Sequence, residues 1–263
     1  MKLSAYIDDL VAHGRCTFTL DEAVPVLNKS RSAVIKAIQH LRGKREIASP
    51  AKSFYVIVDP EYRIYGCLPA EYFVPYLMKY WQQPYYVGLL TAAEYHGAAH
   101  QKPQTFQVIT NKKKPVLQCG KIRIEFLMKG EMENIPLQSF STAKSVLNVS
   151  TPEVTAMDLV CYHQQSGGFG QIVTVLAELC EFMCPDKLSI LAKNTSQIAW
   201  KQRLGYLLEQ VGALPLAKVL KEHLRLQKRV NYILLVPSVK TENNYQRNTE
   251  WKIIVNAVIE GDV

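Results

Sequence analysis

The side chains best suited to recognition chemistry gather on one face of an expected helix that runs from about Arg31 to about Arg42. An α-helix fits the major groove of duplex DNA, where hydroxyl, amide and cationic groups bond base edges and phosphates. The residues predicted to face the bases are Arg31, Ser32, Lys36 and Gln39. The residues predicted to contact mainly phosphates are Lys29, Arg42, Lys44, Arg45 and Lys52. Together they predict a site for double-stranded DNA.

The charge in this stretch has one sign. Between residues 29 and 52 there are seven Lys or Arg and one acid, Glu46. The whole chain has 31 basic and 23 acidic residues, a formal net charge of +8 and a pI near 9.1. Such a balance permits a polyanionic partner. Two other interpretations stay open at this point: a charged helix face that is only solvated, and a helix pair that binds another protein.

Capping signals predict the two helices that would position this face. Thr19 and Glu22 have the spacing of a capping box, which begins a first helix. Ser30 can cap a second helix, and Gly43 can end it. The apolar residues of the second helix recur at spacings of three and four, as in a helix packed on a core: Val34, Ala37, Ile38 and Leu41.

A preceding helix and a following hairpin complete the predicted arrangement. Leu3 to Val11 carry an apolar stripe, and Gly14 can close that helix. Two β-prone runs, Glu46–Ala48 and Phe54–Val58, are joined through residues 50–52. Three helices followed by a hairpin predict a winged helix-turn-helix.

We expect an α+β fold divided into three parts. Residues 1–60 form the winged helix-turn-helix, residues 61–83 a connector with a short helix at Ala70–Trp81, and residues 84–263 a mixed α/β domain. Strands of that domain are expected at Thr105–Thr110, Lys121–Met128, Pro136–Phe140, Val146–Val149, Tyr232–Val236 and Trp251–Val255. Helices are expected from Pro152, and at about Ile172–Phe182, Lys187–Lys193, Ser196–Glu209 and Pro215–Gln227.

A second group of cations lies on or beside one expected hairpin of the mixed domain: Lys112, Lys113, Lys114 and Arg123. A lysine triplet on a loop is most often a solubility feature, and a contact with a phosphate or a partner is the sharper interpretation. Within the strand, Ile122, Ile124, Phe126 and Met128 alternate with other residues and are expected to face a core.

Signals for an active site are weak, so we expect no enzyme, no cofactor and no metal. The sequence has no phosphate-binding G-x-x-x-x-G-K-[ST] loop, and Gly167-Gly168-x-Gly170 is expected to be a turn between helices. Glu153 is expected to cap a helix together with Ser150, since Glu153 and Asp158 lie too far apart around that helix for acid–base work. His96 and His100 lack the glutamate of a zinc-protease motif, and Cys180 and Cys184, with Cys161 upstream, are expected to be buried free thiols.

The compartment is expected to be the cytoplasm. Six scattered cysteines favour reduced thiols. The sequence has no apolar run long enough to span a bilayer, and its start, MKLSAYIDDL, has no apolar signal-peptide core.

Three stretches together resemble the AbiEi family, the antitoxins of type IV toxin–antitoxin systems associated with abortive infection against phage. They are FYVIVDPEYR (54–63), PYYVGLLTAAEYHGAAHQKPQTFQVIT (84–110) and VSTPEVTAMDLVCY (149–162). The resemblance is clearest over residues 19–182. One departure lies in the hairpin turn, where many members have a glycine and this chain has Lys52-Ser53.

The resemblance implies two roles and no catalytic residue. The winged helix would bind inverted repeats upstream of the antitoxin–toxin operon and repress it. The C-terminal antitoxin domain would counteract a cognate nucleotidyltransferase toxin, without need of a stable complex. The rival interpretations are a transcription regulator whose second domain senses a ligand or dimerises, a metal-dependent nuclease, and an RNA-binding protein.

Overall fold

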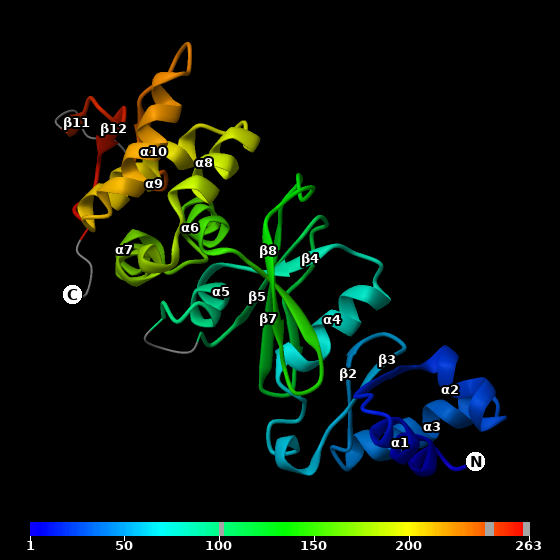
Figure 1. Cartoon of the computed structure of the whole chain (residues 1–263). Coiled ribbons are helices and arrows are strands. Elements are labelled where there is room, and N and C mark those ends of the chain that lie inside the picture. The colour runs from blue at the N-terminus through cyan, green and yellow to red at the C-terminus, as the bar shows by residue number, and fades with distance from the viewer. Residues whose placement is uncertain (100–102, 240–244, 260–263) are drawn as a thin grey trace. The chain divides into compact units, whose positions relative to one another are not determined.

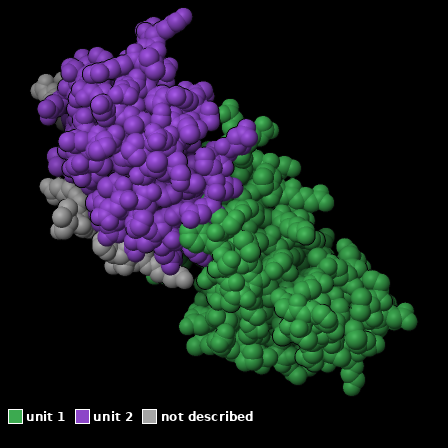
Figure 2. Space-filling view, viewed as in Figure 1, with its two compact units in different colours: residues 1–87, 104–133, 139–149 green, residues 88–103, 134–138, 150–263 purple. Residues whose placement is uncertain are grey.

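The computed structural model describes residues 1–99, 103–239 and 245–259 and has a mixed α+β fold (Figure 1). The chain divides into two compact units (Figure 2). Unit 1 comprises residues 1–87, 104–133 and 139–149, and unit 2 comprises residues 88–103, 134–138 and 150–263. His100, considered above with His96, lies outside the described residues.

Unit 1 begins with three helices: α1 (Leu3–Ala12), α2 (Leu20–Leu27) and α3 (Arg31–Gly43). The capping box is confirmed, since the Glu22 N–H donates to Thr19 Oγ1 at 3.2 Å and the Thr19 N–H donates to Glu22 Oε2 at 2.7 Å. Ser30 caps α3 by accepting the Ala33 N–H at 3.3 Å. The helices share one apolar core, although Val11, predicted to belong to it, is 45% exposed.

A three-stranded sheet follows in the order β1-β3-β2, formed by β1 (Thr17–Thr19), β2 (Ile47–Ala51) and β3 (Phe54–Ile57). Strand β1 was not predicted, because three residues before a capping box are too few to show a period. The turn between β2 and β3 is Lys52-Ser53, not residues 50–52 as predicted. Pro50 lies within β2 at a register shift, where a missing N–H does no harm.

Helix α4 (Ala70–Tyr80) follows the short 3₁₀ turn η1 (Pro60–Tyr62) and packs into the same core as the hairpin. Phe54 and Val56 of β3 share this core with Phe73 and Leu77 of α4 and with Ile124 of the large sheet. This grouping differs from the expected division into residues 1–60, 61–83 and 84–263. The reason is physical: the inner face of the hairpin is buried by α4 and by strands that come later in the chain.

The large sheet has the order β6-β7-β5-β4-β9-β8. Its strands are β4 (Tyr85–Val87), β5 (Phe106–Thr110), β6 (Leu117–Cys119), β7 (Ile122–Met128), β8 (Leu137–Ser141) and β9 (Val146–Ser150). Strand β7 pairs parallel with β5 and antiparallel with β6. The predicted alternation holds at Ile124 and Phe126 but fails at its end, because Leu127 is buried and Met128 is 56% exposed.

Unit 2 is mainly helical, with α5 (Leu89–Tyr95), α6 (Pro152–Cys161), α7 (Gly168–Leu179), α8 (Pro185–Asn194), α9 (Ala199–Gln210), α10 (Leu214–Arg225) and the 3₁₀ turn η2 (Cys180–Phe182). Helix α7 begins earlier than predicted. Gly168 and Gly170 therefore lie in its first turn, and only Gly167 belongs to the connection, with a left-handed φ of 77°.

Unit 2 also holds a small sheet, ordered β10-β12-β11, from β10 (Ile233–Leu234), β11 (Gln246–Asn248) and β12 (Ile253–Val255). Trp251 attaches it to α9, because its ring is fully buried and its Nε1 donates to Glu209 Oε2 at 2.7 Å. The ring lies where a side chain on Gly205 would be, since an added Cβ would approach Trp251 to 2.0 Å.

Candidate nucleic-acid interface

Helix α3 presents the predicted polar face to solvent. Val34 and Ile38 are buried, and Leu41 is half-buried. The predicted DNA-binding residues are all exposed: Lys29, Arg31, Ser32, Lys36, Gln39, Arg42, Lys44, Arg45 and Lys52. His40, exposed on the same helix, was not predicted, although its place between Gln39 and Arg42 could have suggested it. The face can donate hydrogen bonds and offers cations, which suits phosphates and base edges.

Arg31 differs from the other cations on this surface because it already has an acidic partner. Its Nη1 lies 2.6 Å from Asp21 Oδ1 of α2, and both side chains are more than half exposed. An exposed pair of this kind contributes little to stability. Ser32 Oγ lies 3.2 Å from Ser30 Oγ, which links it to the residue that caps the helix.

The β2–β3 turn places Lys52 at its exposed tip. Ser53 has a φ of 61°, in the left-handed region that favours glycine. A glycine would adopt this φ without strain. The turn is held from below by α4: the Tyr80 hydroxyl donates to the Lys52 carbonyl oxygen at 3.1 Å, and the Tyr80 and Phe54 rings lie 5.3 Å apart.

The lysine triplet lies in the loop between β5 and β6. Lys112 and Lys113 are exposed, whereas Lys114 is half-buried with its Nζ 4.2 Å from the centroid of the Trp81 ring. Such a contact is a cation–π interaction. Because Trp81 follows Tyr80 directly, the triplet reaches the same end of α4 that supports the Lys52 turn. Arg123 is exposed on β7, paired in register with Gln118 of β6.

Helix α6 of unit 2 buries the two acids considered above for acid–base chemistry. Glu153 is 2% exposed and Asp158 is fully buried. Glu153 does not form the predicted capping box with Ser150, because Thr151 is the N-cap of α6 and Ser150 Oγ lies 2.7 Å from Thr155 Oγ1. Glu153 Oε1 instead accepts the Cys184 N–H at 2.8 Å, at the start of α8. The carboxylate thus joins two helices.

The histidine and cysteine side chains of unit 2 were also considered above as metal ligands. His96 Nε2 lies 2.7 Å from the Ser150 carbonyl oxygen, and burial lowers the pKa of His96. Cys180 and Cys184 are half-buried and Cys161 is exposed, so none of the three thiols is buried as expected. Within residues 1–99, 103–239 and 245–259, no three His, Cys, Asp or Glu side chains are placed to hold a metal ion.

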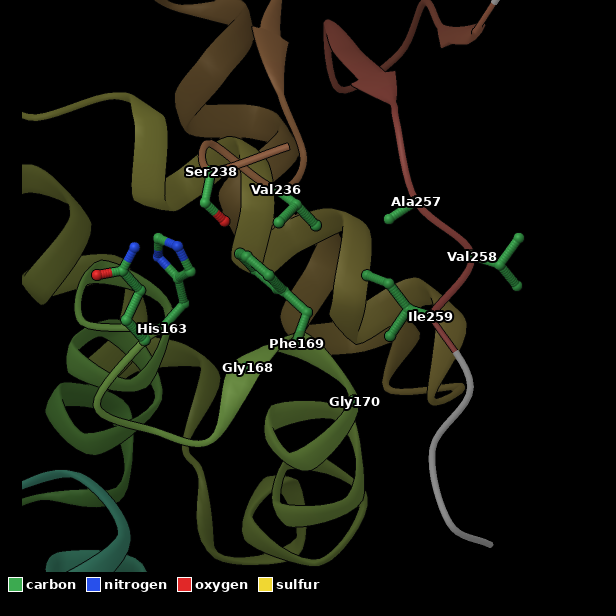
Figure 3. A pocket seen from close by; sticks show the side chains of 10 residues that line it. His163, Gly168, Phe169, Gly170, Val236, Ser238, Ala257, Val258 and Ile259 are labelled. Atoms are coloured by element: carbon green, nitrogen blue, oxygen red, sulfur yellow. The ribbon is translucent and has the colours of Figure 1, made fainter. Parts of the chain in front are cut away.

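A cavity of about 450 Å³ opens beside the start of α7 (Figure 3). His163 and Phe169 line it with stacked rings whose centroids lie 5.1 Å apart, and Val236, Ser238 and Ile259 contribute to its walls. Burial lowers the pKa of His163, followed in effect by the charge of Arg203. The lining is mainly apolar with a few polar groups, which is typical of a recess for a small molecule.

Comparison with known proteins identifies one segment of the chain. Residues 86–210 match the family model of the AbiEi antitoxin C-terminal domain. The fold is similar to the crystal structure of the RV2827C protein from Mycobacterium tuberculosis, with a TM-score of 0.68 and 14% identity, covering 95% of this chain and 90% of that chain. At that identity the likeness shows the fold alone. No match was found among curated protein sequences. In the part of the chain that the structure describes, no helix is both long and apolar enough to cross a membrane.

Proposed function

The chain belongs to the AbiEi antitoxin family through residues 86–210, and from that premise we propose a type IV antitoxin that also represses its own operon. Three helices followed by a β2–β3 hairpin are the elements of a winged helix-turn-helix. In this proposal α3 enters the major groove of operator DNA that contains inverted repeats, and the hairpin is the wing. The observation that carries the DNA-binding part is the exposed cationic face of α3 on a buried Val34–Ile38 stripe.

Further cations lie at both ends of α3, the helix proposed to contact the bases. Lys29 lies before α3, and Arg42, Lys44 and Arg45 lie at its end. These residues and Lys52 on the wing would contact phosphates, which fix the position of the protein along the duplex. Arg31, Ser32, Lys36 and Gln39 would face the bases.

The antitoxin role belongs to the matched segment, which contains the lysine triplet 112–114 and Arg123. We propose that the exposed cations among them, Lys112, Lys113 and Arg123, belong to the surface that counteracts a nucleotidyltransferase toxin. Lys114 serves as an internal contrast, because its ammonium group is already held over Trp81. Reversal of Lys112 and Lys113 to Glu should therefore reduce rescue from the toxin more than reversal of Lys114 alone, which would instead disturb local packing.

The experiment that tests both roles is co-expression of the full chain with the product of the neighbouring gene, combined with a reporter of the upstream promoter. Growth rescue together with promoter repression is expected. A variant with Lys36 and Gln39 both changed to Ala should lose repression and keep rescue. Rescue lost together with repression in this folded variant would contradict the assignment of the two roles to separate surfaces.

Truncation at the expected boundary of residues 84–263 is a poor way to separate the two roles. A fragment that starts at residue 84 would lack Phe73 and Leu77 of α4, and Phe54 and Val56 of β3, which share a core with Ile124. We expect that fragment to expose this face of the sheet and to be unstable, whereas point substitutions on α3 leave the core intact.

A second candidate is a transcription regulator whose unit 2 senses a ligand. The cavity beside His163 and Phe169 favours it. In that case no toxin partner exists, and a small molecule bound in the cavity changes DNA affinity. Rescue of growth in the co-expression experiment would decide against this candidate.

A further inference from the structure

Two glycines bring distant segments of unit 1 into backbone contact. A Cβ added to Gly120 would lie 2.1 Å from the Tyr65 carbonyl oxygen and 2.9 Å from the Gly66 Cα. The Lys121 N–H donates to that Tyr65 oxygen at 2.7 Å. The turn between β6 and β7 is therefore fixed against the loop that precedes α4, at a separation that only glycine permits.

Each of these glycines is next to a cysteine. Cys67 follows Gly66, and Cys119 precedes Gly120. Both thiols belong to the same apolar core, in which Cys67 is fully buried and Cys119 is 7% exposed, and the two side chains are hydrogen-bonded to each other. A disulfide requires Cα atoms about 4–7 Å apart, and the contact between Gly66 and Gly120 brings the two backbones together beside these cysteines.

We propose that Cys67 and Cys119 are a reversible disulfide site, closed by a peroxide and reopened by a dithiol. This inference is independent of DNA binding and of the toxin. The sequence favoured six reduced thiols and indicated no pair, because the two residues are 52 positions apart and only the fold brings them together.

The roles of the two sulfurs follow from their surroundings. The hydrogen bond from Cys67, and after it the Ser49 backbone N–H, favour the thiolate of Cys119, so the pKa of Cys119 is lowered despite burial. The pKa of Cys67 is raised, first by its hydrogen bond to Cys119 and then by burial. Cys119, which is also the more exposed, is therefore the attacking nucleophile.

The oxidation balances in two steps. The Cys119 thiolate attacks one peroxide oxygen, so an S–O bond forms, the O–O bond breaks, and the first water leaves with the thiol proton. The Cys67 sulfur then attacks the sulfenic sulfur of Cys119, so the S–S bond forms, the S–O bond breaks, and the released hydroxide leaves as the second water with the Cys67 proton. Two electrons pass from the two thiols to the peroxide. A dithiol reverses the change by thiol–disulfide exchange.

The disulfide would lie in the apolar core that packs against the β2–β3 hairpin. It would connect the loop before α4 to the end of β6, and it would close a chain loop of about 50 residues, which restricts the unfolded state. The Ser49 N–H that contacts the Cys119 sulfur belongs to β2, so the bond would form directly against the strand that leads to Lys52.

The test uses the full chain treated with hydrogen peroxide or, in parallel, with diamide. The expected result is an intact mass lower by two hydrogen atoms, a proteolytic peptide that links residues 67 and 119, and a higher denaturant midpoint, all reversed by dithiothreitol. Cys67→Ser should show neither the link nor the shift. Cys161→Ser, at an exposed cysteine, should behave as the parent does.

Two outcomes would overturn the proposal. One is the absence of the linked peptide after both oxidants in protein that keeps its native circular dichroism. The other is oxidation of Cys119 to a sulfenic or sulfinic acid without the link. Should Cys67→Ser fold poorly, Cys119→Ala provides the same control, since it removes the proposed attacking sulfur and leaves a small apolar side chain.

Discussion

Helices α3 and α6 differ in how much of their surface reaches solvent. Helix α3 has 13 residues and buries only Val34 and Ile38, whereas α6 buries every residue from Pro152 to Val160. The polar groups of α3 are available to a partner. Those of α6 are used inside the protein, as at Glu153. Polar side chains are therefore exposed in one helix and take part in packing in the other, and burial distinguishes the two cases.

The largest expected effect is a loss of stability when the narrow apolar stripe of α3 is truncated. Ile38→Ala should cost about 2–5 kcal/mol of stability, because a fully buried side chain leaves a cavity. Leu41→Ala should cost less, because Leu41 is only half-buried, which corrects its predicted place in the core. Denaturant unfolding measures both. A cost for Leu41→Ala equal to that for Ile38→Ala would contradict this description of the stripe.

A second prediction tests the structural role of a polar group in α6. Glu153→Ala should cost about 1–3 kcal/mol, because the Cys184 N–H would lose its acceptor. Glu153→Gln should cost less, since the amide oxygen can still accept that hydrogen bond. The matched control is Glu22→Gln in the exposed capping box of α2. Unfolding curves that superimpose on the parent for Glu153→Ala would remove this carboxylate from the packing of α6 on α8.

A third prediction concerns exposed polar residues of α3, which should affect DNA specificity and not stability. Lys36→Ala and Gln39→Ala should leave stability unchanged, because both side chains are exposed. Each should reduce discrimination between operator and unrelated duplex by about 1–3 kcal/mol. Lys52→Ala should weaken all duplexes more evenly and flatten the salt dependence. Fluorescence anisotropy at several salt concentrations would measure these changes, and unchanged specificity in both α3 variants would show that another surface reads the bases.

Acidity should affect the two regions differently. Burial lowers the pKa values of His96, His163 and His223 from 6.5, and all three lie in unit 2. Their contribution to stability is therefore present above pH about 6.5 and is lost as the pH falls below it, because the unfolded chain binds protons more readily. Hydrogen exchange at two pH values should show the loss in unit 2. A change confined to α1–α3 would be the contrary result.

The smallest expected effect concerns the turn between β2 and β3. Ser53→Gly should stabilise the hairpin by about 1 kcal/mol, because Ser53 holds a left-handed φ that glycine adopts without strain. Ser53→Ala is the matched control and should give no such gain. Thermal unfolding of the two variants would separate the backbone effect from the loss of the hydroxyl.

Local signals predicted local structure well. The Thr19–Glu22 box, the Ser30 cap and the range of α3 depend on neighbours in sequence, and each has a definite residue signature. The polar face of α3 could be predicted for the same reason, because a period of 3.6 divides a helix into a buried and an exposed side.

Features that depend on distant partners could not be predicted in this way. The sequence around Glu153 does not show that its carboxylate accepts a hydrogen bond from the Cys184 N–H. Likewise, the sequence around Phe54 does not show that α4 and Ile124 bury this side chain. The pairing of Cys67 with Cys119 likewise depends on two glycines that approach each other only in the folded chain. A short strand such as β1 is defined by its partner β3 rather than by its own composition.

The contact between α4 and the Lys52 turn has a consequence for the kinetics of the proposed DNA complex. The Tyr80 hydroxyl and ring hold the Lys52 carbonyl and Phe54 before any duplex arrives. The ordering of this turn is thus completed during folding, and association requires no search among loop conformations. Removal of the hydroxyl, as in Tyr80→Phe, would slow the step in which the wing docks on the duplex. It would leave the preceding diffusional association, which is driven by long-range charge, unaltered.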